Sequence, residues 1–168
     1  QLSPNPFAFE VLNLVSKSRA KAKKIEILKE YGDPSLKTLF IWNFDESVIS
    51  VLPPGEVPYF GEEGETLSDR IQSSIEKMGD SESIGSTDQK YTAIRSEYKK
   101  FYNFIKGGND ALSSLRREAI FIEMLEGMHP LEAEILCLCK DKKLSDKYKI
   151  TKEIVSEAYP DIKWGGRS

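Results

Sequence analysis

Apolar side chains recur every three or four residues along most of this chain, and glycine or proline interrupts each run. This spacing places the apolar side chains on one face of an α-helix, whereas a half-buried strand needs a strict alternation that hardly occurs here. A chain of 168 residues is typical of one domain. The pattern therefore predicts an all-α fold over residues 1–168, a single-domain helical bundle of about seven helices.

Residues that start or stop helices define the predicted boundaries. Asp33 and Pro34 fit an N-cap and a first helical position, and Gly32 and Gly127 fit helix ends. The helix that ends near residue 126 has the widest apolar face, so we expect it to be central and heavily buried. We expect helices across residues 7–15, 19–31, 34–44, 67–78 and 91–105, from 109 or 110 to 126, and across 130–140 and 151–158.

An acidic segment separates two more basic parts of the chain. Residues 51–88 carry nine acidic and two basic side chains, whereas residues 89–168 carry fifteen basic and twelve acidic ones. Prolines, glycines and glutamates dominate residues 53–66. We interpret residues 53–88 as a long acidic, partly irregular connector that includes the helix at 67–78.

Two further segments are predicted to be non-helical. Residues 48–52 indicate a short strand or an extended arm, which Pro53, Pro54 and Gly55 end. The pair Gly165 and Gly166 predicts a flexible C-terminal tail at residues 161–168.

The chain contains one histidine and two cysteines, which argues against most metal sites and most histidine-dependent catalysis. His129 precedes Pro130 at a predicted helix start, so we interpret it as a helix-start residue. A catalytic role would require a carboxylate and a pocket beside it. Cys137 and Cys139 are interpreted as two reduced thiols. We therefore predict no catalytic residue, no metal site and no cofactor. No apolar run is long enough to span a membrane, and no secretory signal pattern is present.

Six lysines form the candidate nucleic-acid site. They stand against only Asp141 and Asp146, which leaves a local net charge of +4 that could contact phosphates. The flanking helices have a loose helix-turn-helix outline, but the connection is longer than the usual turn and the second helix carries Glu153 and Glu157. A solvated surface between two helices is the alternative. The six are Lys140, Lys142, Lys143, Lys147, Lys149 and Lys152.

Two tryptophans and the arm at residues 48–52 are the candidate contacts for a protein partner. On the predicted helix Phe40 and Phe44 share one face and Trp42 points elsewhere, so we expect Trp42 to be exposed. Trp164 lies in the C-terminal tail and is the second candidate.

Several stretches of the chain resemble an uncharacterised family of small proteins encoded by T-even-like marine bacteriophages, notably cyanophages. That family has no assigned activity, so the resemblance implies an origin and a host-cell setting but no catalytic residues. The stretches that carry it are residues 104–109, 115–119, 124–130, 140–144 and 157–161, together with 10–17 and 52–59.

These observations predict a non-enzymatic bacteriophage accessory protein that acts as a protein-interaction module in phage or host machinery. The expected setting is the cytoplasm of an infected bacterium, without membrane association. Two alternatives stay open: a nucleic-acid-binding accessory, or a transcription or replication factor, that uses the basic C-terminal helix pair, and a minor structural component of the virion.

Overall fold

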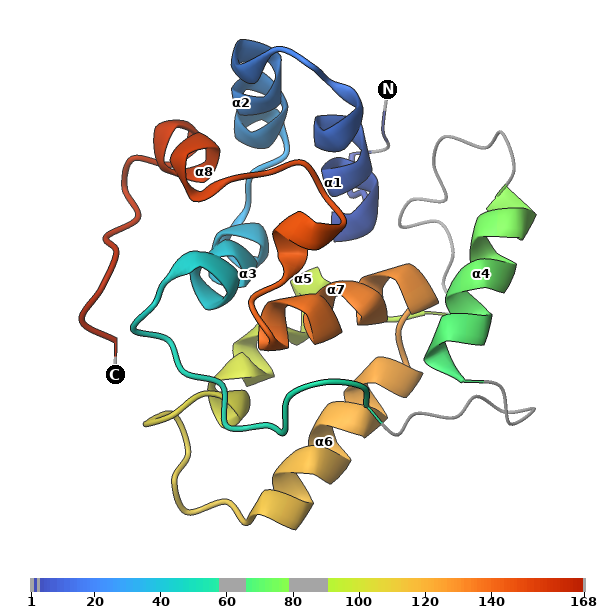
Figure 1. Cartoon of the computed structure of the whole chain (residues 1–168), viewed down its shortest axis with the longest axis vertical. Helices are drawn as coiled ribbons and strands as arrows, with labels where there is room; N and C mark the ends of the chain where they lie inside the picture. The colour runs from blue at the N-terminus through green and yellow to red at the C-terminus, as the bar shows by residue number, and fades with distance from the viewer. Residues whose placement is uncertain (1, 3, 58–65, 79–90, 168) are drawn as a thin grey trace.

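The computed structural model of the chain describes residues 2, 4–57, 66–78 and 91–167. These residues form an all-α single-domain fold, as predicted, and the extended pairing among them is limited to two isolated bridges. The elements, shown in Figure 1, are α1 (Ala8–Lys17), α2 (Lys21–Glu30), α3 (Pro34–Phe44), α4 (Leu67–Met78), α5 (Ile94–Glu97), the 3-10 helix η2 (Tyr98–Phe104), α6 (Ser114–Glu126), α7 (Pro130–Lys140), the 3-10 helix η3 (Leu144–Asp146) and α8 (Lys152–Ala158).

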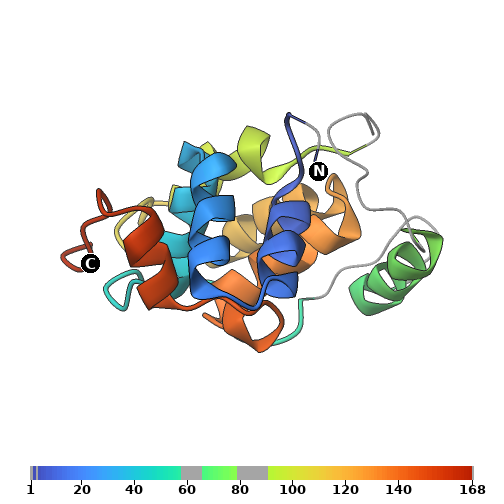
Figure 2. The same cartoon turned by 90° about the horizontal axis from the view of Figure 1, so that it is seen from above.

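Helix α7 is the central element of the fold, because α1, α3, α4 and α6 all pack against it. Its buried side chains include Leu131, Ile135 and Leu136 and also the polar Glu132 and Lys140. Figures 1 and 2 both place α4 at the edge of the molecule, beside α7.

The expectation that the helix ending near residue 126 is central was wrong. Figure 1 shows α6 at one end of the molecule, and Leu115 in its first turn is 80% exposed. Its N-cap is Ser113, not Asn109 or Asp110, because the Ser113 side chain accepts the Arg116 amide and Asp110 instead accepts the Gly107 amide. A wide apolar face therefore did not identify the central helix.

The predicted helix at 91–105 is replaced by the single turn α5 and the 3-10 helix η2. The aromatic spacing Tyr98, Phe101, Phe104 has a period of three, which suits 3-10 geometry as well as an α-helix. The chain then leaves the helix and pairs with the arm at 48–52: Val51 N donates to Phe104 O at 2.9 Å and Lys106 N donates to Ile49 O at 2.7 Å. The prediction of an extended arm is thus confirmed.

Helices α4, α7 and α8 lie where the sequence predicted them, to within one residue. Residues 58–65 and 79–88 of the predicted connector lie outside the described residues. None of the helices in the described part is both long and apolar enough to cross a membrane.

The C-terminal tail was expected to be flexible, but residues 161–167 are bound to the rest of the fold. The Gly165 amide donates to Asp45 Oδ2 at 3.0 Å. Gly165 and Gly166 have φ values of 89° and 74°, which glycine adopts without strain, so the pair forms the turn that brings Arg167 back to α3.

Candidate functional site

Lys140, a predicted nucleic-acid contact, is buried inside the fold. Its ammonium group donates to the carbonyl oxygens of Pro53 and Gly55, at 2.8 and 3.1 Å, and pairs with Asp141 at 2.8 Å. Only 1% of the side chain is exposed. The prediction that Lys140 contacts nucleic acid is therefore wrong for this fold, since the side chain holds the Pro-Pro-Gly turn against α7.

The other lysines of the cluster contact different parts of the fold. Lys142 Nζ donates to Trp42 O at 2.6 Å and to Asp45 O at 3.0 Å, so it satisfies carbonyls at the end of α3, and burial lowers its pKa. Lys147 forms an ion pair with Glu134. Lys152 lies 5.1 Å from the centre of the Trp164 ring.

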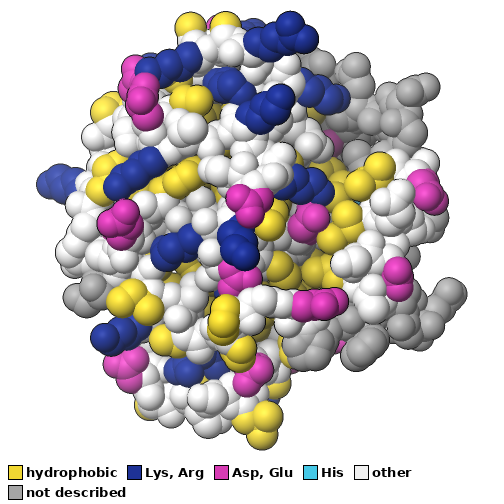
Figure 3. Space-filling model, viewed as in Figure 1, with side chains coloured by type: hydrophobic (Ala, Val, Ile, Leu, Met, Phe, Trp, Pro, Cys, Tyr) yellow, Lys and Arg dark blue, Asp and Glu magenta, His cyan; other side chains and the backbone are white. Residues whose placement is uncertain are grey.

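Lys143 and Lys149 are exposed, and so are Lys142, Lys147 and Lys152 despite the contacts above. Figure 3 shows lysines and arginines interspersed with acidic side chains over the middle and lower parts of this face, whereas basic side chains predominate at its top. Helix α8 packs mainly against α2, and Lys21 of α2 pairs with both Glu153 and Glu157. The two helices of the helix-turn-helix outline therefore have different main packing partners.

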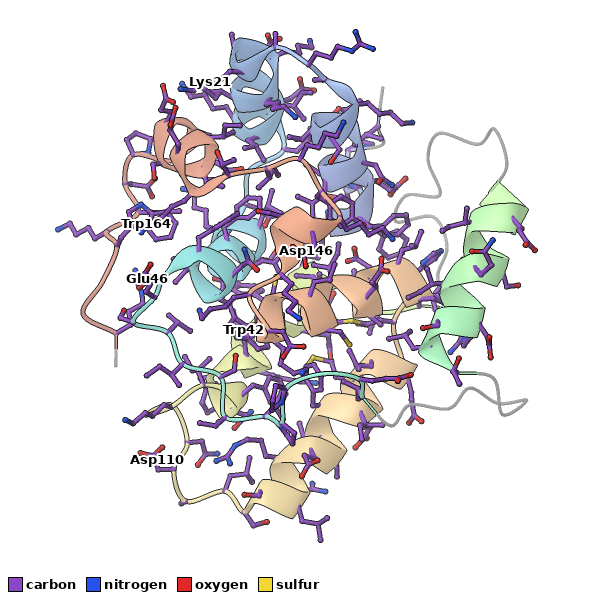
Figure 4. All side chains as sticks on the ribbon, viewed as in Figure 1. Lys21, Trp42, Glu46, Asp110, Asp146 and Trp164 are labelled. Atoms are coloured by element: carbon purple, nitrogen blue, oxygen red, sulfur yellow. The ribbon has the colours of Figure 1, made fainter. Side chains whose placement is uncertain are left out.

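Trp42 is a core residue, so the expectation that it is exposed was wrong. It is 2% exposed, and its ring lies 5.3 Å from Phe101 and 6.2 Å from Phe104 between ring centres. Its indole nitrogen donates to Ser50 Oγ at 2.9 Å. The reason is that η2 packs against α3 and the arm supplies the Ser50 acceptor; Figure 4 labels Trp42 between α3 and η2.

Trp164 is half-buried and belongs to the bound tail. Its indole nitrogen donates to Ser156 Oγ of α8 at 2.9 Å. Asp45, at the end of α3, accepts hydrogen bonds from Ser47, Gly165 and Arg167. Burial alone would raise the pKa of Asp45, but these hydrogen bonds outweigh it and lower the pKa to about 2.

An open cleft of about 380 Å³ lies where three distant segments meet. Residues 4–6 form one wall, the turn at 30–35 between α2 and α3 forms the base, and Arg95 and Tyr98 form the other wall. We call this the N-terminal cleft. Its lining includes two tyrosines, three prolines and a guanidinium group, and tyrosine and arginine are enriched in surfaces that bind proteins.

The lining of the N-terminal cleft carries two acidic residues, Glu30 and Asp33, and one cation, Arg95. Asp33 is occupied as the N-cap of α3, since it accepts the Leu36 amide at 2.9 Å and the Ser35 hydroxyl at 2.5 Å. The Arg95 guanidinium donates to the Pro6 carbonyl oxygen and forms no ion pair with a carboxylate of the described residues. Arg95 therefore retains donors that can meet an anionic group.

Behind the N-terminal cleft lies a small cavity of about 20 Å³, which Arg95, Asp33 and Tyr31 also line. Its inner wall includes Glu132, whose side chain is fully buried. Burial raises the pKa of Glu132 to about 7, although hydrogen bonds from the amides of Phe9, Ile94 and Ala8 oppose that shift. A cavity of this volume has room for one water molecule.

His129 is the N-cap of α7, which confirms its interpretation as a helix-start residue. Its Nδ1 accepts the Leu131 amide at 3.1 Å, and its ring stacks on Phe9 with 4.6 Å between centres.

Burial raises the pKa of the Cys137 thiol to about 12 and raises that of Cys139 as well, so both thiols are protonated and unreactive at neutral pH. Within the described ranges, no cluster of three or more His, Cys, Asp or Glu side chains could hold a metal ion.

Residues 11–79 and 80–146 match the model of DUF6433, described as a family of unknown function. The chain belongs to this family. No curated protein and no solved structure matches it. The part of the DUF6433 member that matches includes Asp33, Arg95 and Glu132, whereas residues 4–6 and the C-terminal tail lie outside it.

Sequence reasoning missed Arg95 and Glu132 in this DUF6433 protein. Arg95 stands among other charged residues and looks like an ordinary surface side chain. Glu132 occupies the first turn of α7, where an acidic residue is favoured by the helix dipole whether buried or not. The one available signal was its position between Leu131 and Ala133, in a helix with few other charges.

Proposed function

We propose that this DUF6433 protein is a protein-interaction module, not an enzyme, and that it binds an extended acidic segment of a partner protein in the N-terminal cleft. The observation that carries this proposal is the position of Arg95, a cation in the wall of a 380 Å³ cleft without a carboxylate partner among the described residues. A carboxylate of the partner would complete its hydrogen bonds in the planar, bidentate geometry that guanidinium groups favour.

The walls of the cleft suit the rest of such a segment. Tyr31 and Tyr98 offer rigid aromatic surface with polar hydroxyl groups, and the exposed Pro4 and Pro34 add apolar surface that loses little conformational freedom on binding. An acidic residue of the segment thus meets Arg95 and two aromatic side chains in a lining that also carries Glu30 and Asp33.

A non-enzymatic role is supported by the structural roles of the titratable groups. Asp45 binds the tail, His129 caps α7, the Cys139 thiol is buried and Cys137 is half-buried. Each of these groups stabilises the fold instead of facing a substrate-sized opening. The resemblance to bacteriophage proteins supports a partner from phage or host machinery in an infected bacterium, and incorporation in the virion is the alternative setting.

Peptide selection tests the proposal without knowledge of the partner. A random peptide library is panned against the wild-type protein, and the selected peptides are measured against R95E. We expect enriched peptides to contain Asp or Glu and to bind R95E at least tenfold more weakly, because the substitution reverses the charge that the carboxylate meets.

The matched control is K143E, which reverses an exposed lysine of the sequence cluster and leaves the cleft intact. It should bind the selected peptides with wild-type affinity. The absence of enrichment, peptides without acidic residues, or equal losses in R95E and K143E would each contradict binding of an acidic segment in the N-terminal cleft.

A further inference from the structure

The buried carboxylate of Glu132 connects the two walls of the N-terminal cleft. Its Oε1 accepts the Phe9 amide at 2.8 Å and its Oε2 accepts the Ile94 amide at 3.2 Å. Phe9 lies in the first turn of α1, which follows the wall at residues 4–6, and Ile94 directly precedes Arg95 in the opposite wall. One side chain therefore fixes the backbone on both sides of the opening.

We propose that Glu132 is a positioning residue for the N-terminal cleft: its ionised carboxylate ties the backbone of α1 to that of Ile94, and uptake of a proton frees the Ile94 amide. The wall that carries Arg95 is thereby loosened, while Arg95 still donates to the Pro6 carbonyl oxygen. The effect of Glu132 on the positions of the two walls is argued from its hydrogen bonds. Only the consequence of that effect for partner binding rests on the proposed function.

The chemistry of the carboxyl group supports the loss of one of these two hydrogen bonds on protonation. An ionised carboxylate has two accepting oxygens, whereas in the protonated form one oxygen carries a hydrogen and accepts poorly. The bond to Ile94 is the longer of the two, so we expect it to be the one that breaks. The adjacent 20 Å³ cavity has room for the water molecule that would then satisfy the Ile94 amide.

The environment of Glu132 places its protonation near neutral pH. Burial raises the pKa of Glu132 to about 7, and the negative charge of Glu10 on α1 adds to the rise. Several other titratable groups surround this site. They are Arg95 of α5, Tyr31 and Asp33 at the turn between α2 and α3, His129 at the start of α7, and Tyr148 after η3.

A pH titration followed by NMR tests the proposal on the whole chain. In the ¹⁵N-labelled protein, we expect the amide signals of Phe9 and Ile94 to shift between pH 5 and 9 with one common midpoint, and the Arg95 amide to follow them. The variant E132Q cannot titrate at this position, so all three shifts should disappear from this range. If the signals still titrate in E132Q, His129 or another group is responsible and the proposal is wrong.

The variant E10Q sharpens the assignment, because it removes the like charge that faces Glu132. It should lower the common midpoint without abolishing the shifts. Hydrogen exchange of the wild-type protein provides a second measurement that needs no variant: protection of the Ile94 amide should fall at least tenfold from pH 8 to pH 6, after correction for the intrinsic rate. Unchanged protection would overturn the proposal.

These outcomes are separate from those of the peptide selection. If the amides titrate as expected but no acidic peptide is selected, the positioning role of Glu132 stands and the proposed function fails. If acidic peptides bind, their affinity for the wild-type protein should fall from pH 8 to pH 6. Their affinity for E132Q should not change over this range.

Discussion

Asp45 and Arg167 form an ion pair with 2.5 Å between Oδ2 and Nη1, which joins the end of α3 to the last described residue of the chain. The same carboxylate accepts the Gly165 amide and both the amide and the hydroxyl group of Ser47. One buried acidic side chain thus organises the turn after α3 and the C-terminal tail together. This arrangement makes the tail part of the folded domain.

The first prediction is that D45N destabilises the protein and that the effect depends on pH. The pKa of Asp45 is about 2 in the folded state, below the ordinary value of 3.8, so the ionised carboxylate stabilises the fold above pH 3.8 and loses that contribution as the pH falls toward 2. We expect D45N to lower the free energy of unfolding by about 2 kcal/mol at pH 7 and much less at pH 2. Urea denaturation at both values measures the difference, and an equal loss at both would contradict it.

The second prediction separates two neighbouring lysines that look alike in the sequence. K142E should destabilise the protein by about 2 kcal/mol or more, because it replaces a donor to two carbonyls at the end of α3 with a negative charge. K143E should change stability by less than about 0.5 kcal/mol: both lysines are exposed, but the Lys143 side chain has no hydrogen bond or ion pair with another described residue. Thermal denaturation of both variants tests this contrast, and similar melting temperatures would refute it.

The sequence predicted local structure better than it predicted burial. Proline and glycine positions and apolar periodicity placed α4, α7 and α8 correctly, because helix starts and stops depend on residues close in sequence. The position of Trp42 depends on η2 and the arm, which approach from elsewhere in the chain, so no local pattern revealed it.

The candidate site, too, depends on contacts between segments that are distant in sequence. Charge in the sequence identified the lysine cluster, but the buried position of Lys140 depends on carbonyls of the Pro-Pro-Gly turn. The N-terminal cleft joins residues 4–6, 30–35 and 95–98, and nothing in any one of these segments predicts the other two. A site built from segments that are distant in sequence can be recognised only from the tertiary fold.

The third prediction concerns Tyr148, whose hydroxyl group is buried without a hydrogen-bond partner among the described residues. A buried hydroxyl group that lacks a partner costs free energy relative to water, so its removal should not destabilise the fold. We expect Y148F to leave the free energy of unfolding unchanged or to raise it by about 1 kcal/mol. Y159F is the matched control, because the Tyr159 hydroxyl donates to Leu28 O at 2.5 Å and its loss should be destabilising. Loss of stability in Y148F equal to that in Y159F would show that the Tyr148 hydroxyl has a partner.

The last prediction concerns the energetic effect of Glu132, which differs in sign from that of Asp45. The pKa of Glu132 is about 7 in the folded state and 4.5 in its ordinary range, so the folded protein binds the proton more tightly than the unfolded chain. The contribution of Glu132 to stability is therefore greatest below pH 4.5 and declines as the pH rises through 7. We expect the free energy of unfolding of E132Q, relative to wild type, to rise by up to about 3 kcal/mol from pH 5 to pH 8. Urea denaturation of both proteins measures this, and a difference that stays constant with pH would show that Glu132 does not titrate in this range. The expected sign means that the ionised form of Glu132, which accepts the Phe9 and Ile94 amides, is retained in the fold at a cost in stability.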